Sequence, residues 1–284
     1  SAVPKHRYGR YQIADIINEL LDIFEHYLHN RDEFLLRLSV YFGVKLYERE
    51  SVIIFDEVQL YPKARAAIKY LVADGRYDYI ETGSLVSLRQ NVKDIVIPSE
   101  EEAMEMYPMD FEEFLWAMEE EMLADFIRGQ FESSLPMGNL HRKAIDLLRL
   151  YMIVGGMPQA VLTYTKTKDF DEVDRTKRTI LRLYRNDISK YAWQAETKVT
   201  RIFDDIPSQL QKHEKKFRLS AIQTGGKMRD YKDAFFWLDD AKVVNICYNT
   251  TEPNVGLRMN MDRTTLKCYM GDTGLLISHS FDDN

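Results

Sequence analysis

The chain has 284 residues, of which 45% are hydrophobic and 29% charged, with 13 glycines and 8 prolines. This composition excludes a disordered, collagen-like or low-complexity protein, and the length is sufficient for two domains. The two cysteines exclude a disulfide framework and a four-ligand zinc site, so we expect a reduced, cytoplasmic setting. No apolar run approaches the roughly 18 residues of a membrane span, which predicts no membrane partner.

The net charge of −7 is unevenly distributed along the chain. Residues 94–132 contain 13 acidic residues and one arginine, whereas residues 175–235 contain 15 basic and 7 acidic residues. This asymmetry favours two modules, the second with a polyanion partner. Two solvated helical faces would give the same pattern.

The first part of the chain predicts helices followed by a parallel sheet. Apolar residues three and four apart predict helix over residues 17–42, interrupted at residues 30–32 and ended by Gly43. The continuous apolar run Val52–Phe55 predicts a strand that is covered on both faces, as in a parallel sheet.

A second strand is predicted after one helix. Pro62 begins this helix, Asp74-Gly75 ends it, and the strand follows at residues 77–81. Strand, helix and strand at this spacing predict a βαβ unit and therefore a parallel sheet. Residues 94–98 predict a third strand, and the acidic run Glu100–Glu102 is interpreted as a solvated helix start.

The later part of the chain is predicted to be mainly helical. Residues 129–140 are rich in small and turn-forming residues, which indicates a loop and a domain boundary. The sequence then predicts helices at 141–153, 158–165, 171–191 and 197–212, and β-like runs at 243–248 and 266–270. Gly155-Gly156 is interpreted as a helix break that allows close packing, with a phosphate-binding turn as the alternative.

The strongest chemical signal is the strand Val52–Phe55 followed by Asp56-Glu57. This pattern is typical of the second nucleotide motif of P-loop ATPases, because a rigid strand holds its terminal carboxylates where ligands bind in α/β sheets. Asp56 would hold Mg²⁺ through its water shell, and Glu57 would polarise the attacking water. The same pattern also occurs at the ends of ordinary strands.

The next strand ends in Thr82-Gly83-Ser84, and Thr82 follows Asp56 by 26 residues. In such ATPases the neighbouring strand ends in a polar residue that senses the γ-phosphate. The alternative is a glycine turn whose hydroxyl group caps the next helix.

Several segments together resemble a prokaryotic AAA+-type ATPase family whose members join an ATPase module to a C-terminal domain of unknown function. Besides the two strand ends, the resemblance rests on residues 97–101, 106–114, 154–158 and 267–276. It covers most of the chain from about residue 16 onward. It implies ATP and Mg²⁺ as cofactors, with Asp56 as the magnesium acid, Glu57 as the catalytic acid and Thr82 or Ser84 as the sensor.

The chain departs from this family in one respect. It contains no Gly-x-x-x-x-Gly-Lys-Ser/Thr loop, and its only Gly-Lys pair, Gly226-Lys227, is followed by Met228. We expect that the first strand and the phosphate loop have been lost or lie outside this chain. Losing three charge-assisted hydrogen bonds would weaken nucleotide binding by about three to six decades. The chain is therefore predicted neither to bind ATP tightly nor to hydrolyse it, and its unpaired sheet edge predicts self-association.

The basic section predicts a winged-helix-like part at about residues 197–250. Lys227, Arg229 and Lys232 at the start of its second helix would contact DNA phosphates or base edges. Acidic residues on the same helix reduce this basic face, and residues 235–238 are predicted to be core. Because winged helices also bind proteins, DNA and protein partners both stay open.

These observations predict an α/β protein with two domains. Residues 1–130 would form an incomplete P-loop ATPase module, a parallel sheet with helices that lacks the first strand and the phosphate loop. Residues 141–284 would form a mainly α domain containing the winged-helix-like part. The leading function is an AAA+-like ATPase with impaired nucleotide binding. The alternative is a non-enzymatic DNA- or protein-binding module that acts through residues 175–248.

Overall fold

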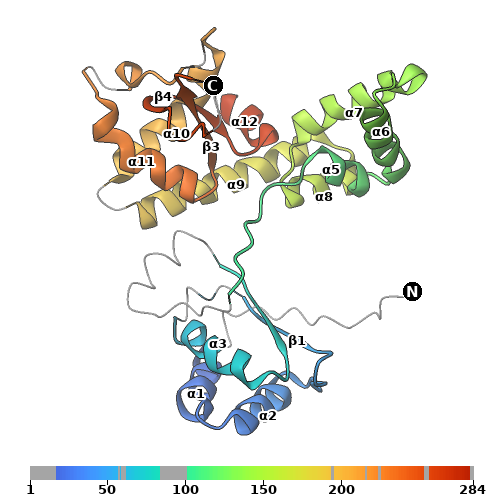
Figure 1. Ribbon diagram of the computed structural model, residues 1–284, viewed down its shortest axis with the longest axis vertical. Coiled ribbons are helices and arrows are strands. Elements are labelled where there is room, and N and C mark those ends of the chain that lie inside the picture. The colour runs from blue at the N-terminus through green and yellow to red at the C-terminus, as the bar shows by residue number, and fades with distance from the viewer. Residues whose placement is uncertain are drawn as a thin grey trace. The chain divides into compact units, whose positions relative to one another are not determined.

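The computed structural model describes residues 17–56, 58, 62–83, 101–192, 195–214, 216–222, 225–252 and 256–281. The chain divides into two compact units, Ser1–Met104 and Glu105–Asn284 (Figure 1). Helices α5 (Phe111–Ala117) and α6 (Glu121–Ser133) pack on each other, and α5 packs on α7 (His141–Val154) and α8 (Pro158–Thr167). All four belong to the second unit. The sequence-based domain boundary, between residues 130 and 141, lies inside that unit.

The first unit begins with a helical hairpin, α1 (Ile17–Tyr27) and α2 (Arg31–Phe42). The Asn30 side chain caps α2 by accepting a hydrogen bond from the backbone N–H of Glu33. Gly43 ends the helix with a φ of 61°, a conformation that favours glycine. The predicted helices, their interruption and their glycine end are thus confirmed.

A βαβ unit follows the helical hairpin. It consists of β1 (Val52–Phe55), α3 (Pro62–Asp74) and β2 (Asp78–Glu81). The two strands pair in parallel, with Val52 opposite Asp78 and Phe55 opposite Glu81. The predicted helix and the parallel pairing are confirmed.

One face of this sheet is covered and the other is open. Ile53, Phe55 and Tyr79 pack against a core that α1, α2 and α3 supply together. That core comprises Ile23, Phe24, Phe34, Leu35, Leu38, Ala67 and Leu71. On the opposite face, Val52, Ile54 and Ile80 are 42%, 49% and 49% exposed. The prediction of a strand covered on both faces is therefore wrong for the described residues, because the three helices contribute to a single core.

The remaining predictions for this unit are only partly visible. Glu57, Ser84 and the predicted strand at 94–98 lie outside the described residues. Residues 101–110 have no regular secondary structure, so the expected helix start at the acidic run is wrong for Glu101 and Glu102.

The second unit begins with short helices. They are α5 (Phe111–Ala117), α6 (Glu121–Ser133), the 3₁₀ turn η3 (Gly138–Leu140), α7 (His141–Val154) and α8 (Pro158–Thr167). Helix α6 extends into the predicted loop at 129–140, because Gly129 continues the helix and Ser134 ends it with a positive φ.

The rest of the unit surrounds an antiparallel hairpin. Its elements are α9 (Phe170–Tyr191), α10 (Glu196–Gln211), the 3₁₀ turn η5 (Leu219–Ala221), α11 (Met228–Asp240), β3 (Val244–Thr250), β4 (Met261–Met270) and α12 (Thr273–Ser280). Strands β3 and β4 pair from Val244–Met270 to Thr250–Met261, with a register shift after Tyr248. The backbone N–H of Phe217 also donates to the carbonyl of Leu266 on β4, at 2.9 Å. The predicted helices from 141 to 212 agree with the structure to within two residues.

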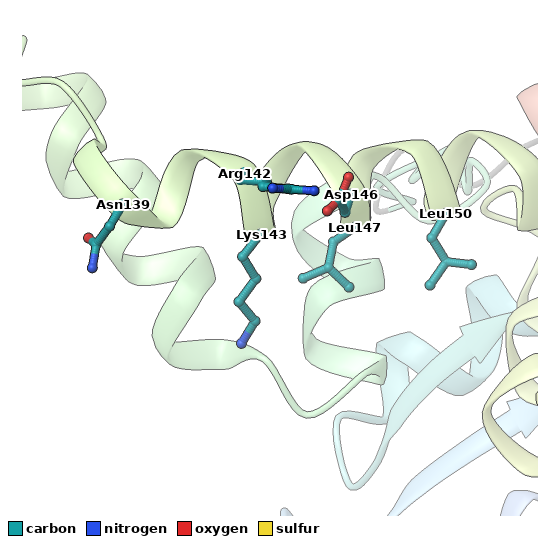
Figure 2. A pocket seen from close by; sticks show the side chains of 6 residues that line it. All are labelled: Asn139, Arg142, Lys143, Asp146, Leu147 and Leu150. Carbon is teal, nitrogen blue, oxygen red and sulfur yellow. The ribbon is translucent and has the colours of Figure 1, made fainter.

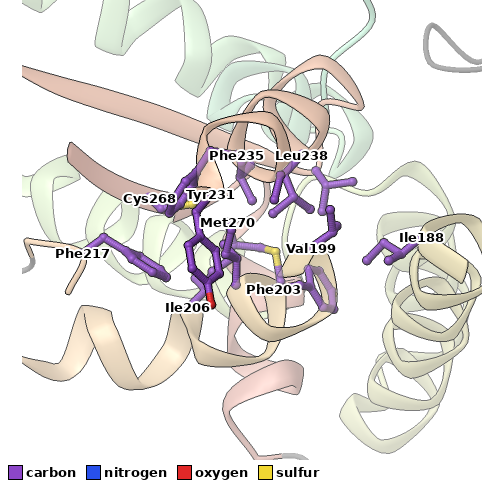
Figure 3. Packing of buried hydrophobic residues seen from close by; sticks show 14 of the residues in the cluster. Ile188, Val199, Phe203, Ile206, Phe217, Tyr231, Phe235, Leu238, Cys268 and Met270 are labelled. Carbon is purple, nitrogen blue, oxygen red and sulfur yellow. The ribbon is translucent and has the colours of Figure 1, made fainter. Parts of the chain in front are cut away.

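A large apolar core joins α9, α10, α11, the hairpin and α12 (Figure 3). Phe235 and Leu238 of α11 point into this core and are 1% and 0% exposed. Phe236 is 60% exposed, so its predicted place in the core is wrong. Successive helical residues are rotated by about 100°, which turns Phe236 away from the face that carries Phe235.

Among the described residues, no single helix combines the length and apolar character that crossing a membrane requires. One sharply bent pair, residues 138–154 with 158–167, satisfies those criteria by length and composition alone.

Candidate functional site

The structure brings Asp56 and Thr82 together at the carboxyl ends of β1 and β2. The parallel register places Phe55 opposite Glu81, so the next residue of each strand lies at the same sheet edge. The backbone N–H of Thr82 donates to the Phe55 carbonyl at 2.9 Å, and that of Val58 donates to the Thr82 carbonyl at 3.0 Å. The Thr82 hydroxyl donates a hydrogen bond to the Asp56 carboxylate.

This pair is open to solvent, because both side chains are exposed. A carboxylate with a neighbouring hydroxyl group suits a hydrated Mg²⁺ ion, since magnesium prefers oxygen ligands and keeps several waters. Within the described part of the chain, no three acidic, histidine or cysteine side chains are grouped to hold a metal. Magnesium would therefore depend on Asp56, water and a phosphate ligand.

An ion cluster around the buried Arg65 lies beside this sheet edge and was not predicted. Arg65 of α3 is only 6% exposed, and its Nη2 donates to both carboxylate oxygens of Glu101 at 2.9 and 2.8 Å. Its Nε lies 3.7 Å from Oε2 of Glu81, the last residue of β2. Burial raises the pKa of Glu81; the nearby Arg65 charge lowers it, and Glu101 raises it further. In the sequence, Arg65 lies three residues before Ile68 and so falls on the apolar face of α3. A charged residue at such a position was the signal that could have indicated this cluster.

Three segments of the family resemblance meet in the second unit. The backbone N–H of Met109 donates to the carbonyl of Gly156 at 2.8 Å. The buried Asp272 carboxylate accepts from the backbone N–H groups of Gly156 at 2.5 Å and Leu275 at 2.7 Å. Gly155 ends α7 with a φ of 84°. A Cβ atom on Gly156 would lie 2.0 Å from the Met109 carbonyl oxygen. The helix-break interpretation of Gly155-Gly156 is therefore confirmed.

The predicted nucleic-acid residues share the exposed start of α11. Lys227 precedes the helix, and Arg229 and Lys232 lie in its first turns, all exposed. Arg229 Nε is 3.5 Å from the Asp230 carboxylate, and the Lys198 ammonium group donates to the Asp230 carbonyl at 2.6 Å. These basic residues lie in the second unit, whereas Asp56 and Thr82 lie in the first.

A shallow groove of about 560 Å³ runs along α7 (Figure 2). It is lined by Asn139, Arg142, Lys143, Asp146, Leu147 and Leu150. Lys143 donates to Glu120 at 2.6 Å and Asp146 accepts from Arg149 at 3.1 Å, so surface ion pairs border the groove. None of the predicted site residues lines it.

Comparison with family profiles finds one match in each part of the chain. Residues 12–115 match the profile of the AAA domain, and residues 145–283 match that of a domain of unknown function (DUF8612). The first match supports an AAA-type P-loop domain, and the second identifies the C-terminal domain that follows it. No curated protein and no solved structure matches the chain.

Proposed function

We propose that the first unit is an AAA+-like nucleotide module whose binding of ATP is impaired in this chain. The observation that carries the proposal is the Thr82–Asp56 hydrogen bond at two adjacent strand ends. The match to the AAA domain supports membership of an ATPase family and the use of nucleotide and magnesium in general.

Each residue has a role in this proposal. Asp56 would hold Mg²⁺ through its water shell, and Thr82 or Ser84 would contact the terminal phosphate. Glu57 would polarise the attacking water. Bound Mg²⁺ would neutralise the charge of the phosphates. The absence of a Gly-x-x-x-x-Gly-Lys-Ser/Thr loop from this sequence removes the backbone cradle and the lysine that hold those phosphates.

The test is thermal melting of the chain with MgATP, using Asp56→Ala and the control Asp78→Ala, an exposed acid at the start of β2. We expect no shift at micromolar nucleotide and a small shift at millimolar nucleotide that Asp56→Ala alone removes. A clear micromolar shift that Asp56→Ala abolishes would refute the impairment and support the site. A shift that survives in Asp56→Ala contradicts the assignment of the site.

A DNA- or protein-binding module is the second candidate. The order α10, η5, α11 and β-hairpin, with the Phe217–Leu266 hydrogen bond, is the order expected for a winged helix. Phe236 is exposed on α11, as are Arg229 and Lys232. The helix therefore presents an aromatic ring and two cationic groups, a combination that suits nucleic-acid binding.

This candidate predicts salt-dependent binding of DNA. Replacing Lys227 and Arg229 with alanine should lower the slope of log affinity against log salt by about 2, since each phosphate contact contributes about 0.9. Lys166→Ala, an exposed lysine of α8, is the control and should leave the slope unchanged. Fluorescence anisotropy of a labelled duplex measures the slope. Equal slopes in the wild type, the double variant and the control would contradict DNA binding through these residues, and a protein-binding module would then be the remaining alternative.

A further inference from the structure

Arg65 is a buried cation with one unsatisfied N–H group among the described residues. Its Nη2 contacts both oxygens of Glu101, but within the described part of the chain its Nε has no hydrogen-bond partner. The Glu81 Oε1 atom is also buried and has no partner among those residues, and the nearest contact between Arg65 and Glu81 is 3.7 Å. A guanidinium group can bridge two carboxylates. In the observed arrangement, Arg65 is hydrogen-bonded to Glu101 but not to Glu81.

The two carboxylates belong to segments with different neighbours. Glu81 directly precedes Thr82, whose hydroxyl contacts Asp56. Glu101 lies near the end of the first unit, and in the second unit Glu105 pairs with Lys242 at 3.0 Å. Only residues 102–104, here called the linker, separate the Glu101 contact from the Glu105 contact.

We propose that Arg65 is a positioning residue that exchanges between Glu101 and Glu81, and that this exchange couples the Asp56–Thr82 pair to the linker. Bidentate pairing of Glu81 with the Nε and Nη2 edge of Arg65 would need an Nη2 hydrogen that Glu101 now accepts, so this pairing would loosen the hold on Glu101. Two such pairings, each excluding the other, are what a switching element requires. A phosphate that engages Thr82 would move the end of β2 and Glu81 with it. This last step rests on the proposed nucleotide site, but the exchange itself does not.

Linker mobility can be measured with a nitroxide label at Ala103→Cys, in a chain carrying Cys247→Ser. Ala103 is exposed, and the remaining Cys268 is buried, which raises the pKa of its thiol to about 12 and keeps it unreactive. Glu101→Gln should raise the ratio of mobile to immobile label about tenfold, because it weakens a charge-assisted pair. The control Glu102→Gln, an exposed neighbour, should change the ratio less than about twofold. Equal effects of these two variants would overturn the proposal.

The coupling is tested by a double-mutant comparison. Thr82→Val removes the hydroxyl that contacts Asp56, and it should change label mobility when Glu81 is present but not in Glu81→Gln. Arg65 is kept in every variant, because its removal would leave Glu81 and Glu101 without their shared cation. Circular dichroism checks that each variant folds. An effect of Thr82→Val that is the same with and without Glu81 would overturn the proposal.

A parallel measurement with MgATP separates this inference from the proposed function. If millimolar MgATP changes label mobility in the wild type but not in Glu81→Gln, both are supported. If MgATP has no effect while Thr82→Val still acts through Glu81, the exchange stands and the nucleotide site fails.

Discussion

Lys177 on α9 shows how burial of one residue makes the stability of the second unit depend on pH. Its side chain is nearly inaccessible and donates to the Ile153 carbonyl at 2.8 Å. Burial lowers the pKa of Lys177, although Asp174 and Asp272 raise it in part. Between this lowered pKa and the ordinary value of 10.5, the unfolded chain binds more protons than the folded chain. The contribution of Lys177 to the free energy of unfolding therefore rises with pH through that window.

Lys177→Met should remove this dependence. The free energy of unfolding of the wild type minus that of the variant should increase as the pH rises toward 10.5. Urea unfolding at several pH values measures this difference. The exposed Lys166→Met is the control, for which the difference should stay flat. A difference for Lys177→Met that falls as the pH rises would contradict this account.

The contacts of some residues could be predicted from the sequence, whereas those of others could not. Asp56 and Thr82 could be predicted to meet, because each follows a strand and parallel strands end at a common edge. The Arg65–Glu101 pair could not be predicted, because the two residues are 36 positions apart and no local pattern links them. Phe236 was misplaced because a run of four apolar residues on a helix cannot all face one side.

At the scale of elements, the junction of α7 and α8 depends on a glycine. A side chain at Gly156 would collide with the Met109 backbone, whereas a Cβ atom on Gly129 of α6 would meet nothing within 4 Å. Gly156→Ala should therefore lower the free energy of unfolding by about 1–3 kcal/mol through overpacking. Gly129→Ala should raise it by about 0.5–1 kcal/mol through helix propensity. Urea unfolding measures both, and equal signs for the two variants would refute the tight junction.

The packing of α11 gives a second prediction at this scale. Phe235 is buried in the core (Figure 3). Its neighbour Phe236 is mostly exposed. Phe235→Ala should cost about 3–5 kcal/mol of unfolding free energy, and Phe236→Ala about 0.5 kcal/mol or less. The two variants remove the same atoms from adjacent positions, so their difference reports burial alone. Similar losses in guanidinium unfolding would mean that α11 is rotated from its described orientation.

The elements themselves could largely be predicted from periodicity, and their layering could not. Helices α7 to α10 agree with their predicted ranges because apolar residues recur at helical spacing over ten or more residues. The run Val52–Phe55 predicted a strand correctly but not its exposed face. A strand's sequence shows that it is apolar, whereas the number of helices that cover it depends on segments elsewhere in the chain.

At the scale of the whole molecule, two units with separate cores should unfold in separate transitions. The three tryptophans, at positions 116, 193 and 237, all belong to the second unit. Tryptophan fluorescence therefore follows that unit, whereas far-UV circular dichroism follows both. The two signals should give different urea transitions in the wild type.

The core residue Leu71, which is 0% exposed, provides the decisive variant. Leu71→Ala removes apolar packing from the first unit and should destabilise it by about 2–5 kcal/mol. The variant should move the circular dichroism transition to lower urea and leave the tryptophan transition in place, because no part of the second core is altered. If both transitions moved together, the prediction would be wrong: the two units would unfold as one cooperative structure, and the linker would couple their stabilities.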